Sequence, residues 1–243
     1  MYQQLDCIAL RNVKYNDRNS ILTVYTRQHG RLAMLLPATA SAESRRLRAL
    51  CQPLSRFTCM ADIRPNRDIY RMRDVKAYAA RSAAAQSPRK AAVALFVADF
   101  LSAILREPQQ DVNLFDYLTL SVGALDSASS QAVANFHIAF LIHLQHFLGI
   151  EPDWSTYTAG TVFDMVDGIF RLSPPLHNRF LPTPEAAEAH TMRRMNFRTS
   201  RLFRLSRTDR NQILDRLIQY YSIHFPGVGA VASLDVLRSL FSF

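Results

Sequence analysis

The sequence predicts an α+β protein in which a small closed β-barrel of five strands, residues 1–80, precedes a helical domain, residues 81–243, with one small β-hairpin. Two observations predict this division. Short apolar runs separated by turn-like segments fill the first part without a helical period, whereas long amphipathic stretches follow. The net charge changes with them, from +8 over residues 1–80 to −5 over residues 81–170 and +6 over residues 171–243.

The barrel is predicted from five runs that alternate with turn residues. They are LDCIALRNV, SILTVYTR, RLAMLLP, LCQPLSRFTCM and RDIYRMRDVKAY. The second and third runs form a hairpin if residues 28–30 make the loop, with its glycine in the left-handed conformation. This register places Val24 opposite Met34 on an apolar face and Arg27 opposite Arg31 on the other face. Opposed like charges destabilise a hairpin, and a bound phosphate would turn their repulsion into a shared contact, so we expect a phosphate-contacting edge here.

Helix signals begin at Ser87-Pro88, where a serine N-cap precedes proline at the first helical position. Further helices are predicted over residues 112–127 and 130–149, from Thr183, over residues 210–224 behind a Ser206 and Asp209 cap, and after Ser233 as an N-cap. The stretch VFDMVDGIFRL is typical of a hairpin that turns at Asp167-Gly168.

Nothing in the sequence predicts a membrane segment or secretion. No run of about 18 uncharged apolar residues occurs, and the N-terminus lacks the basic start and apolar core of a signal peptide. Cys7, Cys51 and Cys59 form no CxxC pair, which indicates reduced thiols without a disulfide framework or a zinc site. We therefore expect a cytoplasmic protein.

Catalytic signals are weak. The chain has no phosphate-binding loop, dinucleotide-binding glycine pattern, nucleophile elbow or zinc-protease motif, and it has seven glycines in all. His143 and His146 have a spacing that metals use, but no third ligand is evident. Asp164 and Asp167 flank a turn, where aspartate is favoured by local backbone bonding. We expect a non-enzymatic protein without a cofactor or metal, whose histidines are packed or partly exposed.

Arginine provides almost all of the positive charge, with lysine at positions 14, 76 and 90. The planar guanidinium suits phosphate binding and base stacking, which favours a nucleic-acid partner over a merely solvated basic face. The candidate contacts are Lys14, Arg18, Arg27, Arg31, Arg45, Arg46, Arg48, Arg71 and Arg73. Arg45, Arg46 and Arg48 are expected in a loop between strands, and Arg71 and Arg73 on one strand face.

Aromatic side chains are interleaved with these cations, at Tyr15, Tyr25, Phe57 and Tyr70. A cationic groove with aromatic platforms is what sequence-tolerant single-strand binding requires, and each stacked base contributes about 1–3 kcal/mol. For any single aromatic residue, a place in the barrel core is favoured over a stacking platform.

A second basic block, MRRMNFRTSRLFRLSRTDR, lies in the helical domain. Arg194, Arg198 and Arg201 recur at helical spacing, which predicts one stripe on a helix. This stripe would be a second nucleic-acid contact, a docking site for an acidic peptide, or a solvated helix face.

The N-terminal residues resemble those of a known family. IALRNVKYNDRNSILTVYTRQHGRLAMLLPA is similar to the N-terminal signature of the RecO family of bacterial recombination mediators and DNA repair proteins. In that signature a strand ending in Leu-Arg precedes a tyrosine, an acidic residue, a Thr-x-x-x-Gly hairpin and a basic loop. The counterparts here are Leu10-Arg11, Tyr15, Asp17, Thr26 to Gly30 and Arg45 to Arg48.

The stretches HLQHFLGIEPD, VFDMVDGIF and YYSIHFPGVGAVASLDVLRSLF follow in the order that the same family has them. The resemblance therefore covers essentially the whole chain, in the style of a Bacteroidetes-type member.

The resemblance implies an N-terminal OB-fold that binds single- and double-stranded DNA, followed by an all-helical domain. It also implies annealing of complementary strands, and cooperation with RecR to load the recombinase RecA onto DNA coated by the single-strand-binding protein SSB. The acidic C-terminal tail of SSB would bind the helical domain, where the Arg193 to Arg210 block is a candidate by charge. A nucleoid-associated, cytoplasmic location follows.

One departure concerns zinc. Many members of the family carry four cysteines after the GIEPD-like and FDMVDGIF-like segments, where this chain has DWSTYTAG and RLSPPLHNRF. A tetrahedral zinc site needs about four nitrogen or sulfur ligands, and His177 alone does not supply them. We expect no metal here, with the hairpin held by apolar packing.

Two other functions are consistent with the same sequence. One is a protein-interaction adaptor whose helical domain grips an acidic peptide, with the barrel incidental. The other is an RNA-binding OB protein of translation, which the composition fits equally well.

Overall fold

The computed structural model describes residues 2–78, 87–228 and 231–240. Its contacts divide the chain into two compact units. The barrel unit comprises residues 1–128 together with the C-terminal stretch that begins at Val231, and the helical unit comprises residues 129–230. The domain boundary expected near residue 80 falls next to residues 79–86, outside the described residues, and stays a prediction.

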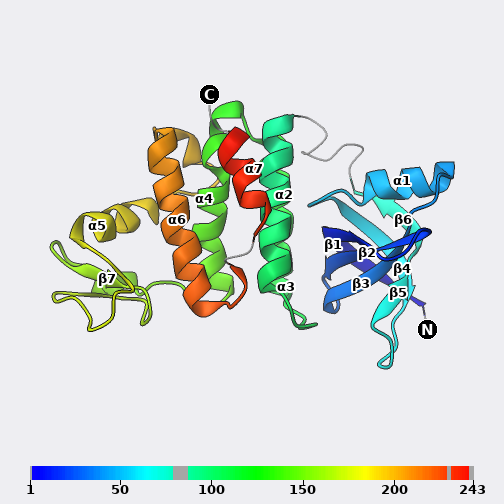
Figure 1. The fold of residues 1–243 in the computed structure, drawn as a ribbon, viewed down its shortest axis with the longest axis horizontal. Helices are drawn as coiled ribbons and strands as arrows, with labels where there is room; N and C mark the ends of the chain where they lie inside the picture. Colours follow the sequence, from blue (N-terminus) through cyan, green and yellow to red (C-terminus); the bar gives the residue numbers. More distant parts are fainter. Residues whose placement is uncertain (1, 79–86, 229–230, 241–243) are drawn as a thin grey trace. The chain divides into compact units, whose positions relative to one another are not determined.

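A curled sheet of six strands forms the half-barrel (Figure 1). The strands are β1 (Tyr2–Lys14), β2 (Asn19–Thr26), β3 (Gly30–Pro37), β4 (Arg56–Asp62), β5 (Ile69–Arg71) and β6 (Arg73–Ala77), in the order β5-β3-β2-β1-β4-β6. The pairing of β3 with β5 is parallel and the other pairings are antiparallel. A helix, α1 (Ala42–Leu50), stands between β3 and β4 in the chain. This curled Greek-key arrangement confirms the predicted fold class, an OB-type sheet followed by helices.

The barrel core follows from the two-residue period of the strands. Every second residue of β3 and of β4 is buried, which places Leu32, Met34 and Leu36 beside Phe57 and Cys59. The alternate residues of these strands are partly exposed. This alternation is the pattern of a sheet with one face on an apolar core.

The hairpin of β2 and β3 forms, but the predicted register was wrong by two residues. Val24 pairs with Leu32, Tyr25 with Arg31 and Thr26 with Gly30, so Arg27 and Arg31 do not oppose each other. The Thr26 side chain fixes the observed register, because its hydroxyl donates to the Gly30 carbonyl and accepts from the His29 N–H. A slip of two residues leaves every side chain on its expected face.

Two further expectations for the barrel were wrong. The fifth predicted strand divides at Met72 into β5, which pairs with β3, and β6, which pairs with β4. The basic segment expected as a loop is the helix α1, because Ser41 caps its first turn by accepting from the Ser44 N–H. Glu43 in the first turn and Arg48 in the last turn suit the helix dipole.

Three helices complete the barrel unit: α2 (Pro88–Ile104), α3 (Val112–Ser127) and α7 (Ser233–Leu240). The caps predicted for the first are confirmed, since Ser87 accepts from the Lys90 N–H and Pro88 opens the helix. Helix α7 packs along α2 (Figure 1). Ser233 is the first residue of α7 rather than its cap, and its hydroxyl donates to Asp99 on α2 at 2.9 Å.

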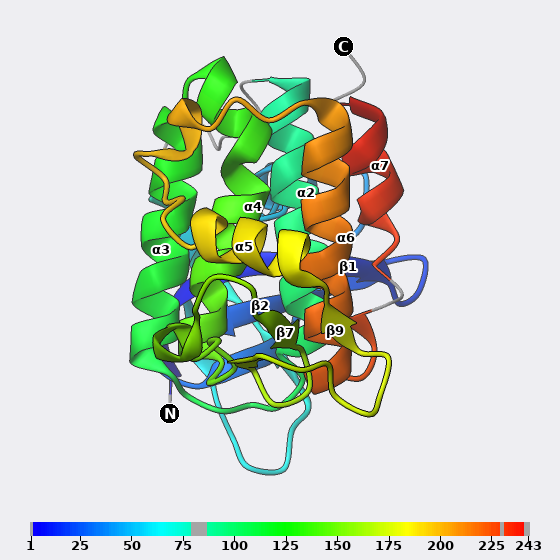
Figure 2. The same ribbon diagram turned by 90° about the vertical axis from the view of Figure 1, so that its left-hand side faces the viewer.

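The helical unit contains α4 (Ser130–Phe147), α5 (Thr183–Met192) and α6 (Arg207–His224), with the 3-10 turns Trp154–Thr156 and Ser200–Leu202. The predicted hairpin is β7 (Val162–Asp164) and β8 (Ile169–Arg171), and β9 (Phe180–Leu181) adds a third strand. Figure 2 shows α5 crossing in front of α4 and α6. None of the helices in the described ranges combines the length and the apolar character that a membrane crossing requires.

Candidate nucleic-acid interface

The face of β2 and β3 is the surface that OB-folds commonly use for oligonucleotides, together with the loops between the first two and the last two barrel strands. In this chain the helices of the barrel unit cover part of that face. The Tyr25 ring stacks on Phe115 of α3 with 6.4 Å between ring centroids, and burial raises the pKa of Tyr25 to about 12. A ligand for this barrel must therefore bind elsewhere than at Tyr25.

Arg27 and Arg31 connect the same hairpin to the helices. The Arg27 guanidinium makes a two-pronged ion pair with Asp116 of α3, which raises the pKa of Arg27. Arg31 donates to the carbonyls of Ser102 and Leu105, at the C-terminal end of α2, with N···O distances of 3.1 and 2.9 Å. The predicted pairing of these two arginines across the hairpin was wrong. Their contacts favour a structural role for both residues, and their contact with phosphate stays a prediction.

Replacing Arg31 with methionine is expected to lower the free energy of unfolding of the barrel unit by about 2 kcal/mol. The substitution keeps the apolar stem but removes two charge-assisted hydrogen bonds to helix carbonyls. Urea unfolding followed by circular dichroism measures the change. Arg71→Met is the matched control, because Arg71 is exposed, and equal stability of both variants would contradict the role given to Arg31.

A groove of about 340 Å³ opens where β3, β5, α1 and the start of β2 meet. Its lining residues are Asn19, Leu35, Pro37, Leu47, Arg71 and Met72. It combines apolar walls with a guanidinium, and it borders the loop between β1 and β2, one of the loops that OB-folds use for ligands.

Three of the predicted arginines gather around this groove. Arg71 lines it directly, and Arg48 donates to the carbonyl of the lining residue Pro37 at 3.3 Å. Arg18 precedes the lining residue Asn19, and its carbonyl accepts from the N–H of Ala38. Three segments that are far apart in the sequence thus bring positive charge to one place, where phosphates bind favourably.

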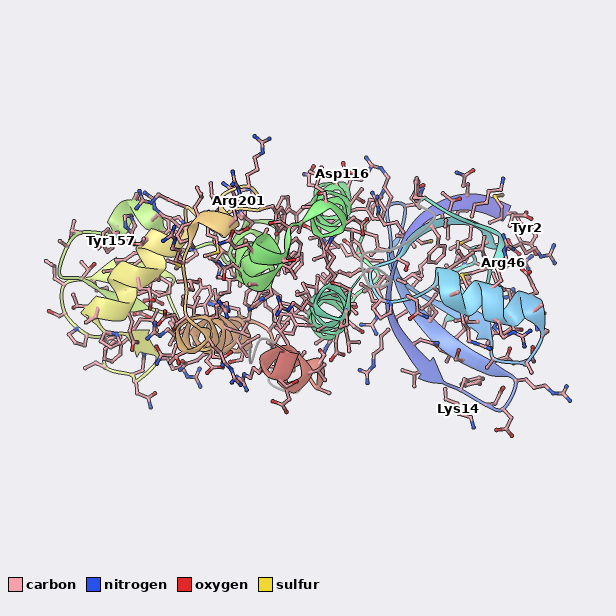
Figure 3. The ribbon with its side chains drawn as sticks, turned by 90° about the horizontal axis from the view of Figure 1, so that it is seen from above. Tyr2, Lys14, Arg46, Asp116, Tyr157 and Arg201 are labelled. Carbon is pink, nitrogen blue, oxygen red and sulfur yellow. The ribbon has the colours of Figure 1, made fainter. Side chains whose placement is uncertain are left out.

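The other predicted cations do not all join this cluster. Arg46 pairs with Glu43 and Lys14 with Asp17, while Arg45 donates to the Ala40 carbonyl. Arg73 belongs to β6 and Arg71 to β5, so they do not share a strand face. Figure 3 shows Lys14 far from Tyr2, at the opposite end of β1.

The aromatic platform predicted from Tyr15, Tyr25, Phe57 and Tyr70 is wrong for three of its members. Tyr25, Phe57 and Tyr70 are buried, whereas Tyr15 is 61% exposed on the loop after β1. Sequence reasoning missed the exposed rings Tyr2 and Tyr78. The alternation of apolar and polar residues did not indicate their exposure, because Tyr2 begins β1 and Tyr78 follows the last residue of β6.

Sequence reasoning also missed Arg64 and Arg67, which are exposed on the loop between β4 and β5. Arg64 is held by Asp62. A proline and an asparagine between two arginines, in the segment IRPNRD, would have indicated a basic turn at this position. It corresponds to the second loop that OB-folds use for ligands.

The second basic block is not one helix. Arg194 and Arg198 lie in turns after α5, and Arg201 lies in the 3-10 turn Ser200–Leu202 (Figure 3). The predicted stripe at helical spacing was therefore wrong, although all three side chains are exposed. The reason is local, because Asn196 accepts from the N–H groups of Arg198 and Thr199 and so builds a turn.

The histidines and aspartates of the helical unit serve packing and turns. His137 is buried, which lowers its pKa to about 3, and a ring nitrogen of His143 lies 3.0 Å from the Met195 carbonyl. The buried Asp164 carboxylate accepts from the turn N–H groups of Val166 and Asp167. Within the described residues, no group of three or more histidine, cysteine, aspartate or glutamate side chains is arranged to hold a metal ion.

The fold and the groove together define an OB-fold protein with a cationic surface at the sheet edge. The profile of the family "Recombination protein O N terminal" matches residues 1–96, and that of "Recombination protein O C terminal" matches residues 85–229. Hence the chain belongs to the RecO family.

Full-length relatives agree with this assignment. The DNA repair protein RecO of Phocaeicola vulgatus is 37% identical over 242 residues, and the match covers 100% of both chains. RecO of Bacteroides fragilis is 36% identical over 99% of this chain and 100% of its own. RecO of Porphyromonas gingivalis is 35% identical over 96% of this chain and 97% of its own. The chain is a DNA repair and recombination protein of this family.

Proposed function

We propose that this chain is a recombination mediator that binds single- and double-stranded DNA, anneals complementary strands and helps to load RecA onto SSB-coated DNA. It acts by binding rather than by catalysis. The observation that carries the proposal is the groove bordered by Arg18, Arg48 and Arg71, at the edge of an OB-type sheet. Phosphates are the ligand class that this cluster suits, since the guanidinium fork matches their oxygens.

The charge distribution supports a polyanion partner. Residues 1–80 carry a net charge of +8, most of it arginine. Charge of this kind attracts nucleic acid over distances comparable with the Debye length and releases counterions on binding. Annealing needs two negatively charged strands to approach each other, and a cationic surface lowers their repulsion.

Family membership supports a proposal for the partners. We propose RecR and the acidic C-terminal tail of SSB as protein partners, with RecA affected indirectly, in the cytoplasm on the nucleoid. Arg194, Arg198 and Arg201 are the candidate contacts of the acidic tail, because all three are exposed on the helical unit. No cofactor or metal is part of this proposal.

The experiment is an annealing assay with two complementary DNA oligonucleotides, one labelled with a fluorophore and the other with a quencher. Annealing is followed as the loss of fluorescence. We expect the chain to raise the annealing rate at least tenfold at about 50 mM salt, and the acceleration to fade at high salt because screening removes the phosphate contacts. An RNA pair of the same sequence is run in parallel. No acceleration with DNA would contradict the proposal, and a preference for the RNA pair would favour the RNA-binding alternative.

A further inference from the structure

The outer face of β1, β4 and β6 carries a second arrangement of cations and rings. The residues of this face that matter here are Tyr2 and Asp6 on β1, Arg56 on β4 and Arg73 on β6. Tyr78 directly follows β6. Tyr2 is 45% exposed and Tyr78 is 56% exposed. Both rings therefore present part of their surface to a ligand.

Each tyrosine of this face is paired with an arginine. The Arg73 guanidinium carbon lies 4.8 Å from the centroid of the Tyr2 ring, and that of Arg56 lies 5.8 Å from the centroid of the Tyr78 ring. The Tyr78 hydroxyl donates to Asp6 at 2.5 Å, which fixes the ring. These contacts hold two planar groups at each position, and both aromatic rings and guanidinium planes stack on unpaired bases.

The two pairs are spaced along the strands. Tyr2 pairs across the sheet with Asp62, and Ile8 pairs with Arg56, so the pairs are six residues apart on β1. At about 3.3 Å per residue this separation is roughly 20 Å. Such a span suits a short stretch of extended single strand, in keeping with OB-fold sites of about four nucleotides or more.

This face is separate from the groove. The groove is lined by residues of β2, β3, α1 and β5, together with Met72, and none of Tyr2, Arg56, Arg73 and Tyr78 lines it. An arginine accompanies each ring, Arg73 or Arg56, and Lys76 is exposed between them. Asp62, which pairs with Tyr2 across the sheet, is held by Arg64. Asp6 is engaged by Tyr78 and by the Gln28 amide.

We propose that the Tyr2–Arg73 and Tyr78–Arg56 pairs form a base-stacking site for single-stranded DNA, distinct from the phosphate-binding groove. The inference rests on the proposed function, since it assigns the bases of the same ligand to a second surface. The groove holds phosphates of either single or double strands, whereas the tyrosine face recognises unpaired bases. This face would therefore add affinity for single strands but not for duplex DNA.

The test compares two fluorescein-labelled strands of about 15 nucleotides by anisotropy, one of oligothymidylate and one of abasic sugar-phosphate units. Replacing both rings, as Tyr2→Leu with Tyr78→Leu, is expected to weaken binding of oligothymidylate about tenfold or more. Binding of the abasic strand should change less than twofold, because its phosphates are the same. Tyr2→Phe alone keeps both rings and the hydrogen bond from Tyr78 to Asp6, and it should retain the affinity of the unmodified chain.

Leu120→Ala is the control, since that side chain is 70% exposed on α3 and belongs neither to the groove nor to the tyrosine face. Unchanged binding of oligothymidylate by the double leucine variant would overturn the stacking site and leave the proposed function standing. Equal losses on both strands would also overturn it, because they indicate a change in fold or in phosphate binding. If the unmodified chain bound neither strand, both proposals would fall.

Discussion

Charge reversal at the groove, as Arg18→Glu with Arg71→Glu, is expected to weaken binding of a single-stranded DNA oligonucleotide roughly 100-fold at about 100 mM salt. Arg71 lines the groove and Arg18 stands next to it. A charge-assisted hydrogen bond contributes about 1.5–3 kcal/mol, so the loss of two of them accounts for this factor. Fluorescence anisotropy of a labelled oligonucleotide measures the affinity.

The control for this prediction is the double variant Arg89→Glu with Arg179→Glu. Both side chains are exposed and lie outside the half-barrel, on α2 and on the loop before β9. The two double variants lower the net charge equally, so a general electrostatic effect would weaken them alike. A loss confined to the groove variant is the expected outcome, and equal losses would remove the groove as the binding site.

Replacing Gly30 with alanine is expected to cost the barrel unit about 3 kcal/mol of stability and to lower its melting temperature by about 10 °C. Gly30 has a φ of +65°, which alanine adopts only with strain. A β-carbon at this position would lie 2.0 Å from the Gln109 carbonyl oxygen and 2.6 Å from its carbon. Because these are backbone atoms, either the hairpin or the loop between α2 and α3 must move.

The variant Gly149→Ala separates the effect of backbone strain from the effect of the clash with Gln109. Gly149 has a φ of +69°, but apart from its own chain neighbours no atom crowds the position that its β-carbon would take within 4 Å. We expect this variant to cost about 1 kcal/mol, from backbone strain alone. Scanning calorimetry compares the two variants. A Gly30 variant as stable as the Gly149 variant would show that the contact with Gln109 does not hold the hairpin.

Local signals in the sequence predicted much of the fold. Ser87 with Pro88 marks the start of α2, and Ser206 with Asp209 caps α6 through a reciprocal pair of hydrogen bonds. These predictions succeeded because a cap depends on residues within one turn of helix. The β7–β8 hairpin was predictable for a similar reason, since Gly168 adopts the positive φ that its turn requires.

The candidate site depends on contacts that no local pattern contains. The predicted pairing of Arg27 with Arg31 was wrong, and the partners that they have instead, Asp116 and the carbonyls at the end of α2, lie more than 70 residues away in the sequence. The sequence places Tyr25 in a strand, but it does not show whether the ring faces solvent or packs against another element. In the structure the ring stacks on Phe115. The groove likewise arises only when α1, β3 and β5 meet.

The central claim, that the groove binds phosphates of single-stranded DNA, is tested most directly by the salt dependence of binding. For single strands the slope of log affinity against log salt is about −0.7 for each phosphate neutralised. The unmodified chain should show a steep negative slope, and the variant Arg18→Glu with Arg71→Glu should show a slope shallower by about 1.4. Identical slopes for the two proteins would contradict the claim, because they would show that Arg18 and Arg71 contact no phosphate.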